Sequence, residues 1–199
     1  APGIDSFDDY SRWDIYYSFG PDCIYPSKNL VLSSVGCHVY LSPAEEQSVR
    51  ENVQANVVSL AEANPEIDFY YFFTPYSAAW WQNKLESGQI QMVFRAEQIA
   101  VEEILKCENI KLFSLSDDAD VCMDLNNYKD PTHYAPWINS LFLKLMRDER
   151  CILTEDNYLQ RLDAQHSLYT EFDYNSLLTQ EDYEDDLIAQ KRLFSKYGF

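Results

Sequence analysis

An aspartate and a histidine in one short segment are the pair in this chain best suited to chemistry. Asp130 and His133 stand in Asp-Pro-Thr-His, which has the D-x-x-H form. A nucleophilic serine needs a base to accept its proton, and histidine has an unperturbed pKa that suits this role. A carboxylate beside the other ring nitrogen fixes the tautomer and stabilises the imidazolium. The pair therefore predicts the base and its orienting partner in a serine-hydrolase site. The structural alternative is a histidine that caps the next helix or bonds within a loop.

Two apolar segments of strand length precede this pair and must position it. Residues 67–73 and 109–114 are predicted strands, and the first has the continuous apolar character of a strand buried on both faces. A helix is predicted between them, from about residue 89 to 107, which completes a βαβ unit. Because ligands bind beyond the carboxyl ends of parallel strands, residues 74–77 and 126–134 should lie at one edge of the sheet.

Capping and apolar periodicity predict further helices on both sides of these strands. Ser42 opens a capping box with Pro at the first helical position, and its helix should end near residue 63. Another helix is expected over about 136–148, followed by one capped by Thr154 and a last one capped by Thr179. The fold class is therefore predicted to be α/β, three-layered α/β/α and flavodoxin-like. Two strands of its parallel sheet are explicit in the sequence.

The same pattern divides the chain into three parts. Residues 1–41 are aromatic and turn-rich without clean periodicity, and we expect an irregular cap segment there. Residues 42–150 hold the predicted strands and the Asp130–His133 pair, so they form the α/β domain. Residues 151–199 are expected to be a C-terminal helical extension.

Aromatic and polar side chains follow the first predicted strand and are candidates for substrate binding. They are Tyr76, Ser77, Trp80 and Trp81, together with Tyr134 beside His133. Clustered aromatic rings at this edge could stack on sugar rings. The alternative is that they pack against the following helix, since buried aromatic side chains dominate core energetics.

Several motifs in the chain resemble those of SGNH/GDSL hydrolases. The matching segments are Phe72–Ser77, Asn109–Ser114, Leu125–Tyr134 and Trp137–Asn139. They are most similar to bacterial, often membrane-anchored SGNH-like proteins related to the D-alanyl-lipoteichoic-acid transfer family. The resemblance covers roughly residues 50–175 and the C-terminal part of such a domain. It implies that His133 is the catalytic base and that Asp130 orients it.

The chain departs from this family at the nucleophile. The family places a serine in a Gly-Asp-Ser or Gly-Ser-Ser turn after its first strand, and no such turn is present in the sequence. Ser33 and Ser34 follow a short apolar run and are the remaining candidates. Because the chain begins at Ala1 without an initiator Met, we expect the part that bears the nucleophile to lie upstream.

The resemblance implies an enzyme of the cell envelope. It would be an acyl-ester hydrolase or O-acyltransferase that acts on a glycan or lipid-linked substrate, outside the cytoplasm of a bacterium, with a membrane anchor upstream. The alternative is a non-catalytic SGNH-like module that binds a glycan or a protein partner. These two functions differ in whether a serine hydroxyl reaches the His133 ring.

The composition of the chain argues against several classes of partner and cofactor. The net charge of −18 argues against nucleic acids and anionic membrane surfaces, because both are bound mainly through Lys and Arg. No apolar run is long enough to span a bilayer. The five cysteines lack C-x-x-C spacing, so no zinc site or other cofactor is expected, although a single Cys23–Cys37 bridge is left open.

Other polar residues are assigned structural roles. The aspartates between residues 117 and 124 lack the Gly and Glu of an EF-hand, so an acidic solvated loop is predicted. His38 and His166 have no chemical partners nearby in sequence, and we expect both to be structural or solvated. No metal ligands are predicted.

Overall fold

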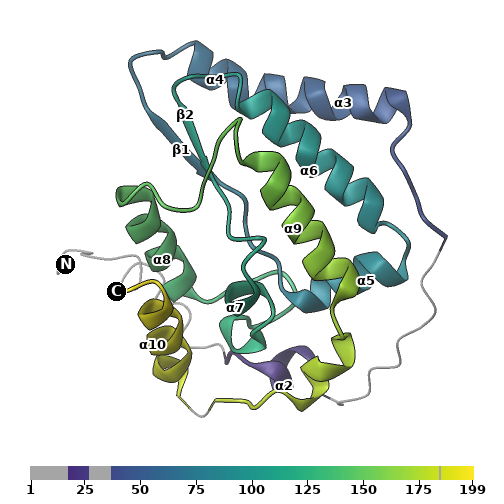
Figure 1. Cartoon of the computed structure of the whole chain (residues 1–199), viewed down its shortest axis with the longest axis vertical. Coiled ribbons are helices and arrows are strands. Elements are labelled where there is room, and N and C mark those ends of the chain that lie inside the picture. Colours follow the sequence, from purple (N-terminus) through teal and green to yellow (C-terminus); the bar gives the residue numbers. More distant parts are fainter. Residues whose placement is uncertain (1–17, 27–36, 184) are drawn as a thin grey trace.

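The computed structural model describes residues 18–26, 37–183 and 185–199 of the chain. Helices surround a small three-stranded sheet, so the architecture is mixed α/β as predicted (Figure 1). Among the described helices, none combines the length and the apolar character that crossing a bilayer requires. Ser33, Ser34 and most of the predicted cap segment lie outside the described residues.

The sheet has the strand order β1-β2-β3. Strand β1 (Phe69–Phe72) pairs in parallel with β2 (Ile110–Phe113), which confirms the predicted βαβ unit. Strand β3 (Ile152–Leu153) pairs antiparallel with β2, so the sheet is mixed and the prediction of a purely parallel sheet is wrong. A two-residue strand has too little sequence for a periodic pattern, which is why no prediction included it.

Strand β1 lies at an edge of this sheet and is only partly covered. Its residues are half-buried, and Tyr70 is 44% exposed, so the prediction of a strand buried on both faces is wrong. Strand β2 lies between its two neighbours and is the buried one. A continuous apolar run therefore marked a strand correctly but did not distinguish a central strand from an edge strand.

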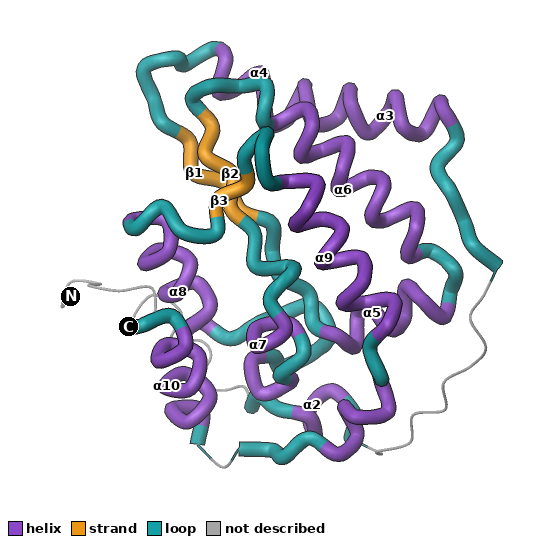
Figure 2. Tube along the Cα trace, viewed as in Figure 1, coloured by secondary structure: helices purple, strands orange, loops and turns teal. Residues whose placement is uncertain are grey.

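Side chains on the two faces of the sheet enter two separate core clusters. Leu112 packs with Val58 and Val101 on one face. Phe113 belongs to the larger cluster on the other face, where Phe72 stacks on Phe142 with ring centroids 4.3 Å apart. Figure 2 shows the strands between α8 (Pro136–Arg147) on one side and α6 (Ile90–Ile104) on the other.

The best-patterned helices form where they are predicted. Helix α3 (Pro43–Val53) starts at a complete capping box, in which the Ser42 amide donates to Glu45 Oε2 over 2.8 Å. It continues through the π-helical segment Gln54–Val58 into α4 (Ser59–Glu62). Helices α6 and α8 also match their predicted ranges within a few residues.

Other helices differ from the sequence-based prediction. Helix α5 (Ala78–Glu86) was not predicted, because its aromatic start masks the helical period. Helix α9 (Tyr158–Glu171) begins after Asn157 and not at Thr154. Thr179 closes a 3-10 helix (Tyr174–Thr179), and α10 (Asp186–Lys196) begins only at its aspartate cap, Asp185. Several acidic residues in a row offer alternative caps, and the pattern alone does not choose between them.

The predicted C-terminal extension, residues 151–199, packs with the rest of the described chain. The boundary predicted at residue 150 falls between β2 and β3 of one sheet, and α9 packs against α5 and α6. The short helices α2 (Pro21–Ile24) and α7 (Ala119–Cys122) and the 3-10 helix Leu125–Asn127 complete the described elements. All five cysteines are free, so the Cys23–Cys37 bridge is not formed.

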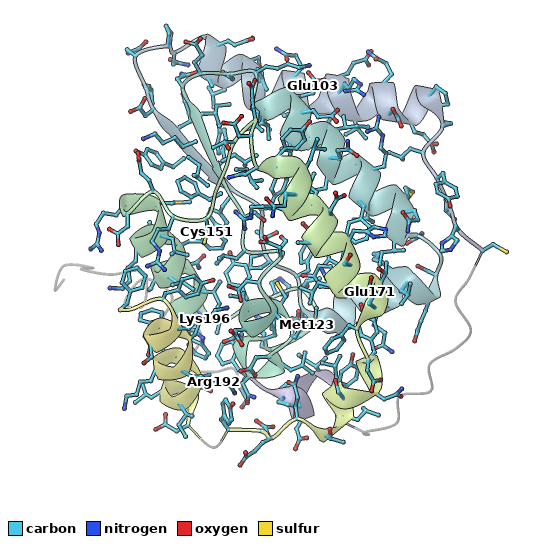
Figure 3. The ribbon with its side chains drawn as sticks, viewed as in Figure 1. Glu103, Met123, Cys151, Glu171, Arg192 and Lys196 are labelled. Atoms are coloured by element: carbon cyan, nitrogen blue, oxygen red, sulfur yellow. The ribbon has the colours of Figure 1, made fainter. Side chains whose placement is uncertain are left out.

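The acidic loop between residues 117 and 124 is anchored to the rest of the protein, which corrects the prediction of a solvated loop. Asp118 caps α7, and its carboxylate also lies 2.6 Å from Lys196 Nζ of α10. Lys196 and Arg192 are labelled on α10 in Figure 3, and Arg192 lies 3.8 Å from Asp124. Only Asp120 is largely exposed, at 54% of its side chain. The cations come from far along the chain, so local sequence did not reveal them.

Candidate functional site

The loop that carries the Asp130–His133 pair docks against the residues that follow β1. The Tyr128 hydroxyl donates to the Pro75 carbonyl over 2.9 Å. The Ser77 hydroxyl donates to the Pro131 carbonyl over 2.8 Å, and the Ser77 amide donates to the same oxygen. The two segments therefore meet at the carboxyl end of β1, as the βαβ topology predicts.

Asp130 and His133 are in direct contact. His133 Nδ1 lies 2.7 Å from Asp130 Oδ2 and 2.9 Å from Oδ1. Asp130 Oδ1 also accepts the backbone amides of Thr132 and His133, each over 2.9 Å, so the loop closes around the carboxylate. The His133 side chain is 64% exposed, which leaves the ring accessible to a ligand from solvent.

The environment of Asp130 favours its charged form. Partial burial raises the pKa of the Asp130 carboxyl, but hydrogen bonds from Thr132 and His133 outweigh it, and the net pKa is lowered. An ionised carboxylate accepts a proton-bearing Nδ1, so the neutral ring keeps its lone pair on Nε2. Among the described residues, no side chain is hydrogen-bonded to Nε2 of His133.

No described serine is placed to act as the nucleophile. The Ser77 side chain is fully buried, and its hydroxyl is committed to the Pro131 carbonyl. The hydroxyl nearest the ring belongs to Thr132, 3.2 Å from Nδ1, which is the nitrogen that already faces Asp130. Ser33 and Ser34 lie outside the described residues, so the structure places neither of them.

The predicted aromatic residues separate into a surface group and a core group. Tyr76 and Trp80 are half-buried and lie with ring centroids 4.5 Å apart. Tyr134 is also half-buried, and its hydroxyl donates to Asn139. Trp81 is 3% exposed and stacks on Phe94 and Tyr169. It is therefore a core residue and not a surface for stacking on sugar rings. Three of the four aromatic candidates thus lie near the surface.

Asn127 holds the His133 loop in place and was not singled out by sequence reasoning. Its side-chain amide donates to the carbonyls of Asp120 and Val121, and its Oδ1 accepts from Trp137 Nε1. The Asn127 carbonyl accepts the Ala135 amide over 2.7 Å. A buried amide with all of its groups paired fixes one loop conformation. Asn126 and Asn127 stand just before the D-x-x-H segment, and this pair was the sequence signal that could have indicated the role of Asn127.

Replacing Asn127 with Ala should lower the free energy of unfolding by roughly 2 kcal/mol, because buried carbonyls and the Trp137 indole lose their partners. Urea denaturation followed by fluorescence would measure the change. Asn175→Ala is the matched control, since Asn175 is exposed and bonds only within its own turn. Equal midpoints for the two variants would contradict the role of Asn127.

A cavity of about 400 Å³ adjoins the loop of the candidate pair. Its wall includes Pro131 from that loop and residues of α2 and α5. The polar residues among them are Tyr25, Gln82, Asn83 and Glu86. Sequence reasoning missed these residues, because α5 was not predicted and α2 is distant in sequence from the loop.

The other two histidines each lie against neighbouring side chains. The His38 side chain is exposed, with its ring tilted against Tyr40. His166 packs against Phe94 and bonds to Gln91, which fits a structural role. Within the described part of the chain, no group of three or more His, Cys, Asp or Glu side chains could hold a metal ion.

Comparison with known proteins gives no indication of the family or the function of this chain. No protein-family model matches this chain, and searches of curated proteins and of solved structures found no match either. The function of the chain therefore has to be inferred from the geometry of its own residues and from the motif resemblance.

Proposed function

We propose that this chain is the C-terminal part of an SGNH-like acyl-ester hydrolase or O-acyltransferase that acts on a cell-envelope glycan or a lipid-linked substrate. The contact between His133 Nδ1 and Asp130 Oδ2, 2.7 Å long in an exposed loop, is the observation that carries the proposal. The position of this loop at the carboxyl end of β1 supports it. The resemblance of Leu125–Tyr134 to the family motif points the same way.

In the proposed mechanism, His133 acts as a general base through Nε2. It accepts the proton of a serine hydroxyl while the serine oxygen attacks the ester carbonyl, and Asp130 stabilises the imidazolium that forms. The imidazolium then donates that proton to the departing alcohol, which leaves an acyl-serine. Water or an acceptor hydroxyl then loses its proton to His133 and attacks the acyl carbonyl, and the imidazolium returns that proton to the departing serine oxygen. The serine would be Ser33, Ser34 or one upstream of this chain.

The finer architecture belongs to the same proposal. We take the sheet to be part of a three-layer α/β/α domain, with α8 on one face and α6 on the other. On its outer side β1 has no pairing partner among the described residues, which is compatible with further parallel strands supplied from elsewhere in the protein. A location outside the cytoplasm of a bacterium rests on the resemblance.

Hydrolysis of p-nitrophenyl acetate tests the catalytic role of His133. If the chain is active, the rate should fall by about tenfold or more in His133→Ala, because the general base is lost. His38→Ala is the matched control, since His38 is exposed and lies outside the site. With Ser33 or Ser34 as the nucleophile, a fluorophosphonate probe should label that serine in the wild type and much less of it in His133→Ala. With an upstream serine, the same comparison is made on the longer protein that carries it.

A non-catalytic module that binds a glycan or a protein partner is the second candidate. The observation that favours it is that no described serine lies beside the His133 ring, while Ser77 is buried and bonded to Pro131. Equal ester hydrolysis by the wild type and His133→Ala, together with no probe labelling, would favour this binding function when it is found in a protein that includes the residues upstream of Ala1.

A further inference from the structure

The cavity beside the His133 loop has a polar wall built from connected side chains. Gln82 is 3% exposed, and its amide is fixed at both ends. Its oxygen accepts from the Tyr25 hydroxyl over 2.9 Å, and its nitrogen donates to Glu86 Oε1 over 2.9 Å. Glu86, Tyr25 and the exposed Asn83 also line the cavity, so their side chains can supply hydrogen-bond donors and acceptors to a ligand.

Apolar residues also line the cavity, and one of them belongs to the loop of the candidate pair. The half-buried indole of Trp80 lines the cavity together with Pro131, which follows Asp130 directly. A ligand that fills the cavity would therefore contact the loop that presents His133. The cavity, of about 400 Å³, is of the size that holds a small molecule or one part of a larger one.

Charge and polarity exclude several kinds of ligand. Glu86 is the one charged residue among those that line the cavity, and Lys84 Nζ lies 5.1 Å from the ring centroid of Trp80, another lining residue. These opposite charges favour a neutral ligand over an anion or a cation. Burial, followed by the charge of Glu86, raises the pKa of Tyr25. The phenol therefore stays protonated and donates to Gln82. A long alkyl chain would leave the amide and carboxylate groups of the wall without water or partners, which is costly.

We propose that this cavity binds a single neutral sugar ring of the substrate. The Asn83 amide and the Glu86 carboxylate can pair with ring hydroxyls, while Ile24 and Pro131 can contact the apolar C–H face. The inference rests on the proposed function as far as it concerns a substrate of His133. It decides between the two substrate types named above, in favour of the glycan and against a lipid chain.

Saturation-transfer NMR with a panel of methyl glycosides tests this site directly. Ring protons of at least one glycoside should receive saturation at millimolar concentrations. Glu86→Gln and Asn83→Ala should each weaken binding by roughly five- to tenfold, the loss expected when one hydrogen bond to the ligand is weakened or removed. Glu108→Gln, an exposed carboxylate outside the cavity, is the control for the change in net charge and should bind as the wild type does.

The outcomes separate this inference from the proposed function. No saturation of any glycoside, or binding that is the same in both cavity variants, would overturn the sugar site. Tighter binding of octanoate or choline than of every glycoside would overturn it as well, in favour of a lipid or a cationic ligand. Sugar binding that depends on Glu86, without ester hydrolysis that depends on His133, would keep the sugar site and reject the catalytic function.

Discussion

Replacing Arg161 with Met should lower the free energy of unfolding by roughly 2–3 kcal/mol, because a largely buried carboxylate loses its charged hydrogen-bond partner. Arg161 Nε donates to Asp117 Oδ2 over 2.8 Å, and Nη2 also bonds to the other oxygen of this carboxylate. The two side chains are only about one-fifth exposed, at 20% and 19%. Arg161 further donates to the carbonyls of Ser114 and Cys151, so one guanidinium ties α9 to the ends of β2 and β3.

Arg147→Met is the matched control for this measurement. Arg147 is also paired with an aspartate, Asp148, but its side chain is 67% exposed, so no measurable change in stability is expected. The double variant Arg161→Met/Asp117→Leu should recover part of the loss, because the isolated carboxylate is removed as well. A loss in Arg161→Met no larger than that in Arg147→Met would show that the buried pair does not stabilise the fold.

Replacing Glu97 with Gln should stabilise the protein by roughly 3 kcal/mol above neutral pH. The Glu97 carboxyl lies between α6 and α9, where it accepts from Gln165, a residue that is 2% exposed. Burial raises the pKa of Glu97 to about 7, the bond from Gln165 opposes this, and the charge of Asp117 adds to the rise. Glu97 is therefore charged in the fold only at a cost.

The sign of this effect follows from proton linkage. The folded pKa of Glu97, about 7, lies above the ordinary value of 4.5, so the folded state binds more protons between these pH values. Stability from this group is present in full at low pH, falls as the pH rises through this window and is lost above pH 7. Glutamine keeps the acceptor for Gln165 and carries no charge, so the variant should not lose stability in this way.

Urea unfolding of the wild type and Glu97→Gln across this pH range would measure the difference. The two proteins should be similar in stability near the acidic end of the range and should diverge as the pH rises. Glu155→Gln, at an exposed position, removes the same unit of charge and controls for the net repulsion of a chain that carries −18. A stability difference that does not vary with pH would contradict the raised pKa of Glu97.

The contact between Asp130 and His133 could be predicted from the sequence because the two residues are close along the chain. Asp130 and His133 are three positions apart, and the carboxylate closes the turn between them through the amides of Thr132 and His133. The position of this turn beside β1 also followed from the order of the elements, since parallel strands place their carboxyl ends together. The cavity did not follow, because its walls come from α2, α5 and the loop.

By itself, the sequence determined the elements whose patterns are long or whose signals are local. These are the capping box at Ser42, the periodic helices α6 and α8, and the parallel pair β1 and β2. Each depends on residues a few positions apart, where side-chain period and backbone hydrogen bonding act together.

Only the tertiary structure decided which of these elements are buried and what holds them together. β1 became an edge strand and β3 joined antiparallel, because both outcomes depend on which segments lie next to β2. Asp117 forms a largely buried ion pair because Arg161 reaches it from α9. Burial and charge pairing arise between residues that are distant along the chain, and a local pattern carries no information about that distance in space.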